Sequence, residues 1–283
     1  MCDGRVSFPL LCLIKLVMNK DMIFDADGQA AQTELKDQRK GAVRYMIKTY
    51  VIDTNVLIQA PYAIKGFEPK GVKYLKYKEI ANNKEINAYL QKGNANLGQL
   101  GFTDHSQAHC VQVARQAGKI LKRLGYSEHE IELAKIAGYM HDIGNAINRT
   151  HHAEYGALLA NDLLKETDMS LEDRITVIAA IGNHDESTGS PEDVVSAALI
   201  IADKTDVRRS RVRQKERSAY DIHDRVNYAV TDAKLKIAED RSVIALNLQI
   251  DEKICSMYDY FEIFLERMML CRKAAEILGT TLS

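Results

Sequence analysis

Histidine and aspartate recur in one part of the chain at spacings that suit metal ligands. The stretch AGYMHDIGNAINRTHHAEYGALL (residues 137–159) ends an apolar run with the doublet His141–Asp142 and places His152 a short loop later. Imidazole and carboxylate without thiolate suit Mn, Fe, Zn, Ni or Co, with Mg at a carboxylate-rich position. The candidate metal ligands are His109, His141, Asp142, His152, His184 and Asp203.

Each candidate ligand lies at or near an end of a predicted helix. Periodic apolar residues predict helices over residues 109–125, 127–144, 152–165, 170–184 and 190–206. Ser127 and Glu130 form a capping box, and Pro191 would be the first residue of the last of these helices. In an up-and-down bundle alternate helix ends meet at one pole, so the ligands can converge there.

The number of candidate ligands indicates two divalent ions. Six groups are too many for one tetrahedral ion, but they suit two ions that share Asp142 and keep positions open for water. A water between two cations loses a proton near neutral pH and becomes a nucleophile. Asp142 and Asp203 adjoin apolar segments, and a buried unpaired carboxylate is costly, so each of them needs a cation.

The rest of the chain predicts a mainly α fold, a helical bundle with a small β-hairpin near the C-terminus. Helical patterns dominate from about residue 78, the hairpin is expected over residues 234–251, and an amphipathic helix over 256–278 closes the chain. Residues 1–72 mix a short apolar run, a polar stretch and a strand-like segment. We therefore expect an N-terminal extension over residues 1–72 and one helical domain over residues 73–283.

Composition excludes several other classes of protein. A formal net charge of −1 gives no overall attraction to nucleic acid or anionic membranes. The five cysteines are dispersed, which argues against a disulfide framework or a thiolate zinc site and suits the reducing cytoplasm. No window reaches the roughly 18 apolar residues of a membrane span. Lys15 interrupts the apolar run at residues 8–18, so we interpret it as a strand or a non-native start rather than a secretory signal.

The order His109, His141–Asp142, Asp203 resembles the HD superfamily of metal-dependent phosphohydrolases over about residues 78–278. GFTDHSQAH resembles the entry to that family's first ligand helix. THHAEYGALL and AIGNHDE resemble segments of the HD-GYP branch that place histidines at a second metal, here His152 and His184. The resemblance implies an HD-domain bundle with two metal ions. It also implies that a metal-bridged hydroxide hydrolyses a phosphate monoester or diester of a nucleotide.

The chain departs from the HD-GYP branch at positions that recognise substrate. Asn145 stands where that branch usually has lysine, and Asp185 follows His184 in place of a second histidine. The Gly-Tyr-Pro signature is reduced to STGSP (residues 187–191). Cyclic di-GMP is therefore not expected as the substrate.

These observations lead to an expected role for each site residue. Metal one would be held by His109, His141, Asp142 and Asp203, and metal two by Asp142, His152 and His184. Asp142 and Lys204 would act directly in catalysis, and His105 would protonate the leaving group. Phosphate oxygens of the substrate would contact Asn145, Lys204, Arg208 and Arg209.

The basic run KTDVRRSRVRQKER (residues 204–217) has two interpretations. Charged runs of this kind are usually solvated faces. The run also follows Asp203 directly, so its first residues could bind phosphate.

Alternative functions and partners stay open at the level of sequence. A di-iron oxygenase could use the same ligand cage, and a nucleic-acid-binding or signalling module could use the basic run. The hairpin could join two subunits of a homodimer or cover the core. KTYVIDTNVLI (residues 48–58) resembles the opening strand of PIN-domain nucleases, with Asp53 in the metal-binding position. Because helical sequence begins soon afterwards, we interpret it as a truncated remnant or an upstream start artefact, loosely packed or poorly ordered. An ordinary strand is the alternative, and neither interpretation gives nuclease activity.

Overall fold

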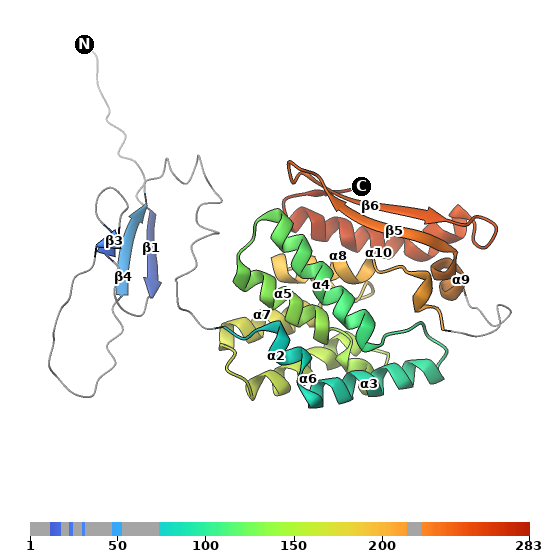
Figure 1. Cartoon of the computed structure of the whole chain (residues 1–283), viewed down its shortest axis with the longest axis horizontal. Helices are drawn as coiled ribbons and strands as arrows, with labels where there is room; N and C mark the ends of the chain where they lie inside the picture. The colour runs from blue at the N-terminus through green and yellow to red at the C-terminus, as the bar shows by residue number, and fades with distance from the viewer. Residues whose placement is uncertain (1–11, 18–22, 25–29, 32–46, 53–73, 214–221) are drawn as a thin grey trace, which may run out of the picture. The chain divides into compact units, whose positions relative to one another are not determined.

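The computed structural model describes residues 12–17, 23–24, 30–31, 47–52, 74–213 and 222–283 (Figure 1). The chain divides into two compact units, Met1–Val72 and Lys73–Ser283. In the first unit β1 (Cys12–Val17) pairs antiparallel with β4 (Ile47–Ile52), and β2 (Ile23–Phe24) pairs with β3 (Ala30–Ala31). The PIN-like interpretation depends on Asp53, which lies outside the described residues. It stays a prediction, as does the assignment of domain types to residues 1–72 and 73–283.

The second unit is a helical bundle with a small sheet, which confirms the predicted fold class (Figure 1). None of the helices in the described part is long and apolar enough to cross a membrane. The described helices of this unit are α2 (Tyr77–Ala81), α3 (Lys84–Gln99), α4 (Gln107–Leu124), α5 (Glu128–Met140), α6 (His152–Lys165), α7 (Leu171–Gly182), α8 (Val194–Lys204), α9 (Ile222–Ala229) and α10 (Met257–Ile277), with short 3-10 helices η1 (Ile143–Ala146) and η2 (Arg209–Arg211).

Side-chain caps fix where most of the ligand-bearing helices begin. The Ser127–Glu130 capping box opens α5 as predicted, and the Ser170 hydroxyl accepts from the backbone N–H of Asp173 at the start of α7. The prediction that Pro191 begins the next helix is wrong. Asp193 accepts from the N–H of Ser196 at 2.7 Å, so α8 begins at Val194.

The core lies where α4, α5 and α8 pack together. Every residue from Val195 to Ala202 is buried, as expected for a helix that is apolar on all sides. Gly138 allows close contact between α4 and α5, because a Cβ there would lie 2.9 Å from the Ala114 Cα. This central helix carries Asp203 at its C-terminal end, so core packing fixes the position of that carboxylate.

The predicted hairpin is present and is longer than expected. Strands β5 (Val230–Ile237) and β6 (Val243–Ile250) pair antiparallel, with Ile237 opposite Ile244. A third strand, β7 (Thr281–Leu282), adds in parallel to β6. The sequence pattern did not predict β7, because two residues are too few to show alternation.

Candidate metal centre

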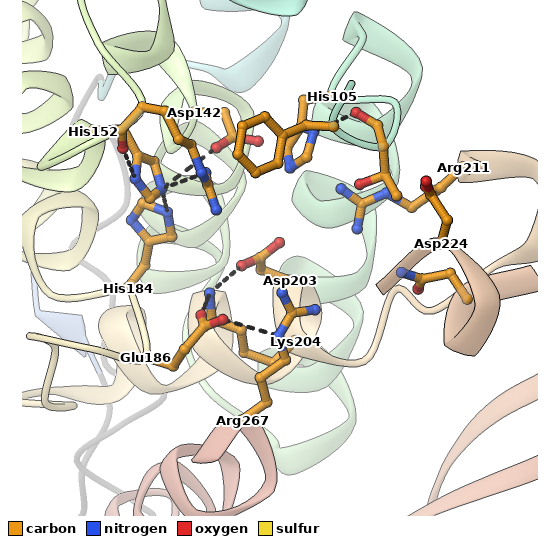
Figure 2. A pocket seen from close by; sticks show the side chains of 14 residues that line it. His105, Asp142, His152, His184, Glu186, Asp203, Lys204, Arg211, Asp224 and Arg267 are labelled. Atoms are coloured by element: carbon orange, nitrogen blue, oxygen red, sulfur yellow. Dashed lines mark hydrogen bonds and ion pairs between the residues drawn. The ribbon is translucent and has the colours of Figure 1, made fainter. Parts of the chain in front are cut away.

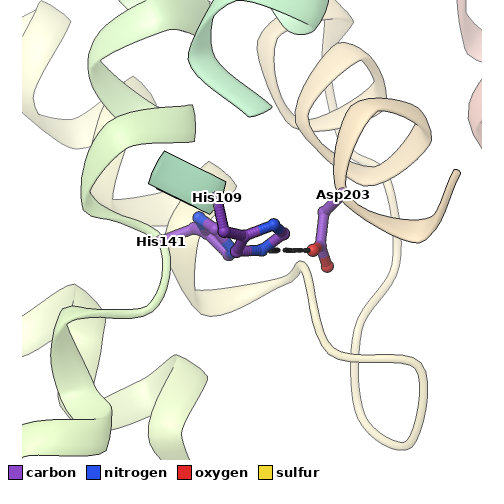
Figure 3. A group of neighbouring side chains, drawn as sticks. All are labelled: His109, His141 and Asp203. Atoms are coloured by element: carbon purple, nitrogen blue, oxygen red, sulfur yellow. Dashed lines mark ion pairs between the residues drawn. The ribbon is translucent and has the colours of Figure 1, made fainter. Parts of the chain in front are cut away.

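The structure brings the six predicted ligands together. Figure 2 shows Asp142, His152, His184 and Asp203, and Figure 3 shows His109 and His141 beside Asp203. All of them lie at or near helix ends. His109 is in the first turn of α4, His141 and Asp142 join α5 to η1, His152 begins α6, His184 follows α7, and Asp203 is near the end of α8. Short caps and a packed core therefore hold imidazoles and carboxylates from five different segments at one place.

The first group of ligands has the spacing of a shared coordination sphere. The Asp203 Oδ1 atom lies 3.3 Å from the His109 Nε2 atom and 3.5 Å from the His141 Nε2 atom (Figure 3). Two atoms that each bind one ion at about 2.1 Å are themselves about 3–3.5 Å apart. These three side chains could therefore hold one divalent ion.

Asp142 connects this first group to the two remaining histidines. Its Oδ2 atom lies 3.2 Å from the His141 Nε2 atom, and its Oδ1 atom lies 3.8 Å from the His152 Nε2 atom. The Nε2 atoms of His152 and His184 are 3.2 Å apart. Asp142 thus directs one carboxylate oxygen to each side, which is the geometry required of a ligand shared by two ions.

Hydrogen bonds on the far side of each ring orient the four histidines. The Nδ1 atoms of His141, His152 and His184 face backbone carbonyls at 2.9, 3.2 and 2.6 Å, each three residues earlier in the chain. The His109 Nδ1 atom faces the Asp206 carboxylate at 2.7 Å. A hydrogen on Nδ1 satisfies each of these contacts, which leaves Nε2 of each ring as the nitrogen that could bind a metal ion.

The carboxylates of Asp142 and Asp203 favour positive charge beside His141, whereas His184 stays a neutral donor. Within the described part of the chain, His109 Nε2, His141 Nε2 and Asp142 Oδ2 are buried and make no hydrogen bond. Burial alone would lower the pKa of His141, but the carboxylates of Asp142 and Asp203 outweigh burial and raise that pKa to about 10. Burial and the neighbouring His152 lower the pKa of His184 to about 3. The donor set therefore fits divalent metal ions.

Asp206 orients His109 and is itself held by an arginine. The Arg208 guanidinium forms a bidentate pair with the Asp206 carboxylate, at 2.5 Å from Nε to Oδ1 and 2.9 Å from Nη2 to Oδ2. Carboxylates that bind the outer nitrogen of a metal-binding histidine raise the basicity of that ligand. Arg208, predicted to contact substrate, is therefore engaged with Asp206 in this structure.

We expect Asp206→Asn to weaken divalent-metal binding about 10- to 100-fold, because the amide is a poorer partner for the His109 Nδ1–H group. Competition with a chromophoric chelator measures this change. Asp232→Asn removes an exposed carboxylate that pairs with Lys234, so it serves as the control and should bind metal like the wild type. Wild-type metal affinity in the Asp206 variant would show that this contact does not support the site.

A pocket of about 170 Å³ opens beside the ligands and is lined by charged side chains. Lys204 is buried in it, with its Nζ atom 2.9 Å from Asp203 and 2.6 Å from Glu186. Burial alone would lower the pKa of Lys204, but Asp203 and Glu186 raise it. The Arg267 Nε atom of α10 donates to Glu186 at 2.9 Å (Figure 2). Lys204 is therefore a fixed cation next to the metal ligands.

Other predicted site residues take different positions. Asn145 is buried and donates to the Asp142 Oδ1 atom at 2.8 Å, so it supports a ligand and is not among the residues that line the pocket. Arg209 donates to the Tyr228 carbonyl and also lies outside the lining. His105 lines the pocket, where its Nδ1 atom faces the Thr103 carbonyl at 2.8 Å. The basic run beyond Arg213 lies outside the described residues.

Sequence reasoning missed several charged groups of the site. Glu186 lies two residues after His184 in AIGNHDE, and Asp206 lies three residues after Asp203, so proximity to a candidate ligand was the available signal. The pocket cations Arg149, Arg211 and Arg267 come from three separate segments, and no local pattern connects them.

Comparison with known proteins agrees with this geometry. The family model of the HD domain matches residues 107–209. An uncharacterized protein of Methanocaldococcus jannaschii, MJ1020, is 27% identical over 198 residues, which are 62% of this chain and 76% of that protein.

Ribonuclease Y of Enterococcus faecalis is 31% identical over 131 residues, and ribonuclease Y of Lawsonia intracellularis is 31% identical over 111 residues. The match to the Enterococcus protein covers 44% of this chain and 23% of that protein. The match to the Lawsonia protein covers 38% of this chain and 20% of that protein. All six candidate ligands lie inside the range matched by the family model. In the structure the His141–Asp142 doublet lies between the other candidate ligands. The chain therefore carries an HD domain, at residues 107–209.

Proposed function

We propose that the chain is a metal-dependent phosphohydrolase that cleaves a phosphate mono- or diester of a nucleotide. The observation that carries this proposal is the convergence of four histidine Nε2 atoms and two carboxylates next to a pocket lined by charged side chains, four of them cationic. His109, His141, Asp142 and Asp203 would hold one ion, and Asp142, His152 and His184 would hold the second. Such ions supply a water of lowered pKa and neutralise charge that develops on a phosphoryl group.

The charges that line the pocket support an anionic substrate. Four carboxylates, those of Asp142, Glu186, Asp203 and Asp224, are matched by four cations, those of Arg149, Lys204, Arg211 and Arg267. Because Asp142 and Asp203 would serve as metal ligands, the cationic side chains would then dominate the field that a substrate meets. Guanidinium and ammonium groups in that arrangement bind phosphate oxygens.

Among nucleotide esters, the similarity to ribonuclease Y favours a phosphodiester of RNA as the substrate. We propose short oligoribonucleotides as the first class to assay, with nucleoside monophosphates as the second. The two classes separate a diesterase from a monoesterase.

The decisive experiment is metal analysis of the purified full chain, followed by assays on phosphate mono- and diesters with and without a chelator. We expect bound divalent metal, hydrolysis of a nucleotide ester, and loss of turnover when the metal is removed. The same assays under anaerobic conditions distinguish a hydrolase from a di-iron oxygenase, because only the oxygenase needs dioxygen for turnover. Turnover that depends on dioxygen and releases no alcohol or phosphate from any ester would overturn the proposal.

A further inference from the structure

One aromatic ring stands out in a pocket that is otherwise polar. Phe102 is the only apolar side chain among the described residues that line the pocket beside the metal ligands. Its side chain is 38% exposed, and it does not belong to either of the apolar clusters that form the core. What distinguishes Phe102 from other exposed apolar residues is its place, since every other described side chain that lines this pocket is polar or charged.

Backbone hydrogen bonds fix the main chain at Phe102. Gly101 follows the Leu100 cap of α3 with a φ of +83°, and the Phe102 N–H donates to the Leu97 carbonyl at 3.0 Å, which together form a Schellman motif. The Phe102 carbonyl accepts a hydrogen bond from the Arg213 Nε atom at 2.8 Å. The ring is therefore presented to the pocket by a rigid turn.

Arg149 connects this ring to the metal ligands. Its guanidinium carbon lies 5.6 Å from the centre of the Phe102 ring, and its Nη1 atom lies 3.3 Å from the His152 Nε2 atom. A cation that can bind phosphate thus lies between an aromatic face and the candidate metal centre. The same order of chemical groups occurs along a nucleotide, whose phosphate is followed by a sugar and then a flat base.

We propose that Phe102 is a stacking platform for the base of the substrate, with Arg149 as the contact between the platform and the phosphate. This inference rests on the proposed function and names the part of the substrate that the site recognises. Stacking on an aromatic face is available to every base, so the platform would favour nucleotides over other phosphate esters without strong preference for one base.

The test compares two ligands that differ only in the base, adenosine 5′-monophosphate and ribose 5-phosphate. The metal-loaded full chain is titrated with each, and the readout is Kd by calorimetry, or KM where a ligand is cleaved. We expect the wild type to bind the nucleotide about tenfold more tightly than ribose 5-phosphate, and Phe102→Ala to remove that preference. Phe102→Tyr keeps the aromatic ring and should keep the preference for the nucleotide. Phe102→Leu should lose most of that preference.

Phe261→Ala is the matched control, because Phe261 is another exposed phenylalanine and lies on α10 outside the pocket lining. It should behave like the wild type. An equal loss of affinity for both ligands in Phe102→Ala would overturn the proposal, since it would show that the ring only positions Arg149. Equal affinity of the wild type for the two ligands would overturn it as well. Failure of the proposed function would appear differently, as a wild-type chain that cleaves no phosphate ester, whatever the binding preference.

Discussion

Asp142→Asn is expected to keep the fold, lose bound divalent metal and hydrolyse phosphate esters at least about 1,000-fold more slowly than the wild type. Asp142 is the carboxylate closest to both groups of histidines, with Oδ2 at 3.2 Å from His141 and Oδ1 at 3.8 Å from His152. The amide removes the negative charge that both ions would share. It keeps the shape of the side chain and can still accept the hydrogen bond that Asn145 donates at 2.8 Å.

Metal content by elemental analysis, turnover on the substrate found for the wild type, and a thermal unfolding curve test this expectation together. The unfolding curve separates a chemical loss from a folding defect. Asp162→Asn is the control, because Asp162 is an exposed carboxylate on α6 whose nearest cation is Lys165. If the Asp142 variant bound as much metal as the wild type and turned over at the same rate, the two-metal scheme would be wrong.

The convergence of the candidate ligands was predictable from sequence because helical periodicity places their segments. His109 lies in the first turn of a strongly periodic helix, and Ser127 and Ser170 are caps whose hydrogen bonds depend only on local sequence. The start of α8 was predicted wrongly, since Pro191 and Asp193 both suit a helix start and only the reciprocal bond with Ser196 decides between them. Local rules therefore fix the type and order of the helices more securely than their first residues.

The groups that support the ligands could not be predicted in the same way. Arg208 follows Asp206 by two residues in a segment without regular structure, and the pairing of these side chains depends on the conformation of that segment. Glu186 lies between α7 and α8, and Arg267 lies on α10, so the two residues are far apart in sequence and meet only in the folded chain. Both contacts depend on the conformation of the folded chain, which residue type alone does not give.

Gly144→Ala is expected to have the largest effect on stability, because backbone atoms occupy the space that a side chain would need. Gly144 lies in η1, directly after the His141–Asp142 doublet, where this segment crosses the first turn of α6. A Cβ at this position would lie 2.0 Å from the His152 carbonyl oxygen and 2.5 Å from the Gly156 nitrogen. Neither atom can move without shifting α6, so the cost should reach about 3 kcal/mol, the upper end for overpacked cores.

The same shift would act on the metal centre, since His152 is the first residue of α6 and faces His184 across 3.2 Å. Gly144→Ala should therefore lower Tm by about 5–10 °C and weaken metal binding at once, as measured by thermal unfolding and chelator competition. Gly182→Ala is the matched control, because its Cβ would meet only the Ala157 Cβ at an ordinary 3.5 Å. A Gly144 variant as stable as the Gly182 variant would show that η1 and α6 do not approach each other so closely. The doublet and His152 would then have to be held together by something other than this contact.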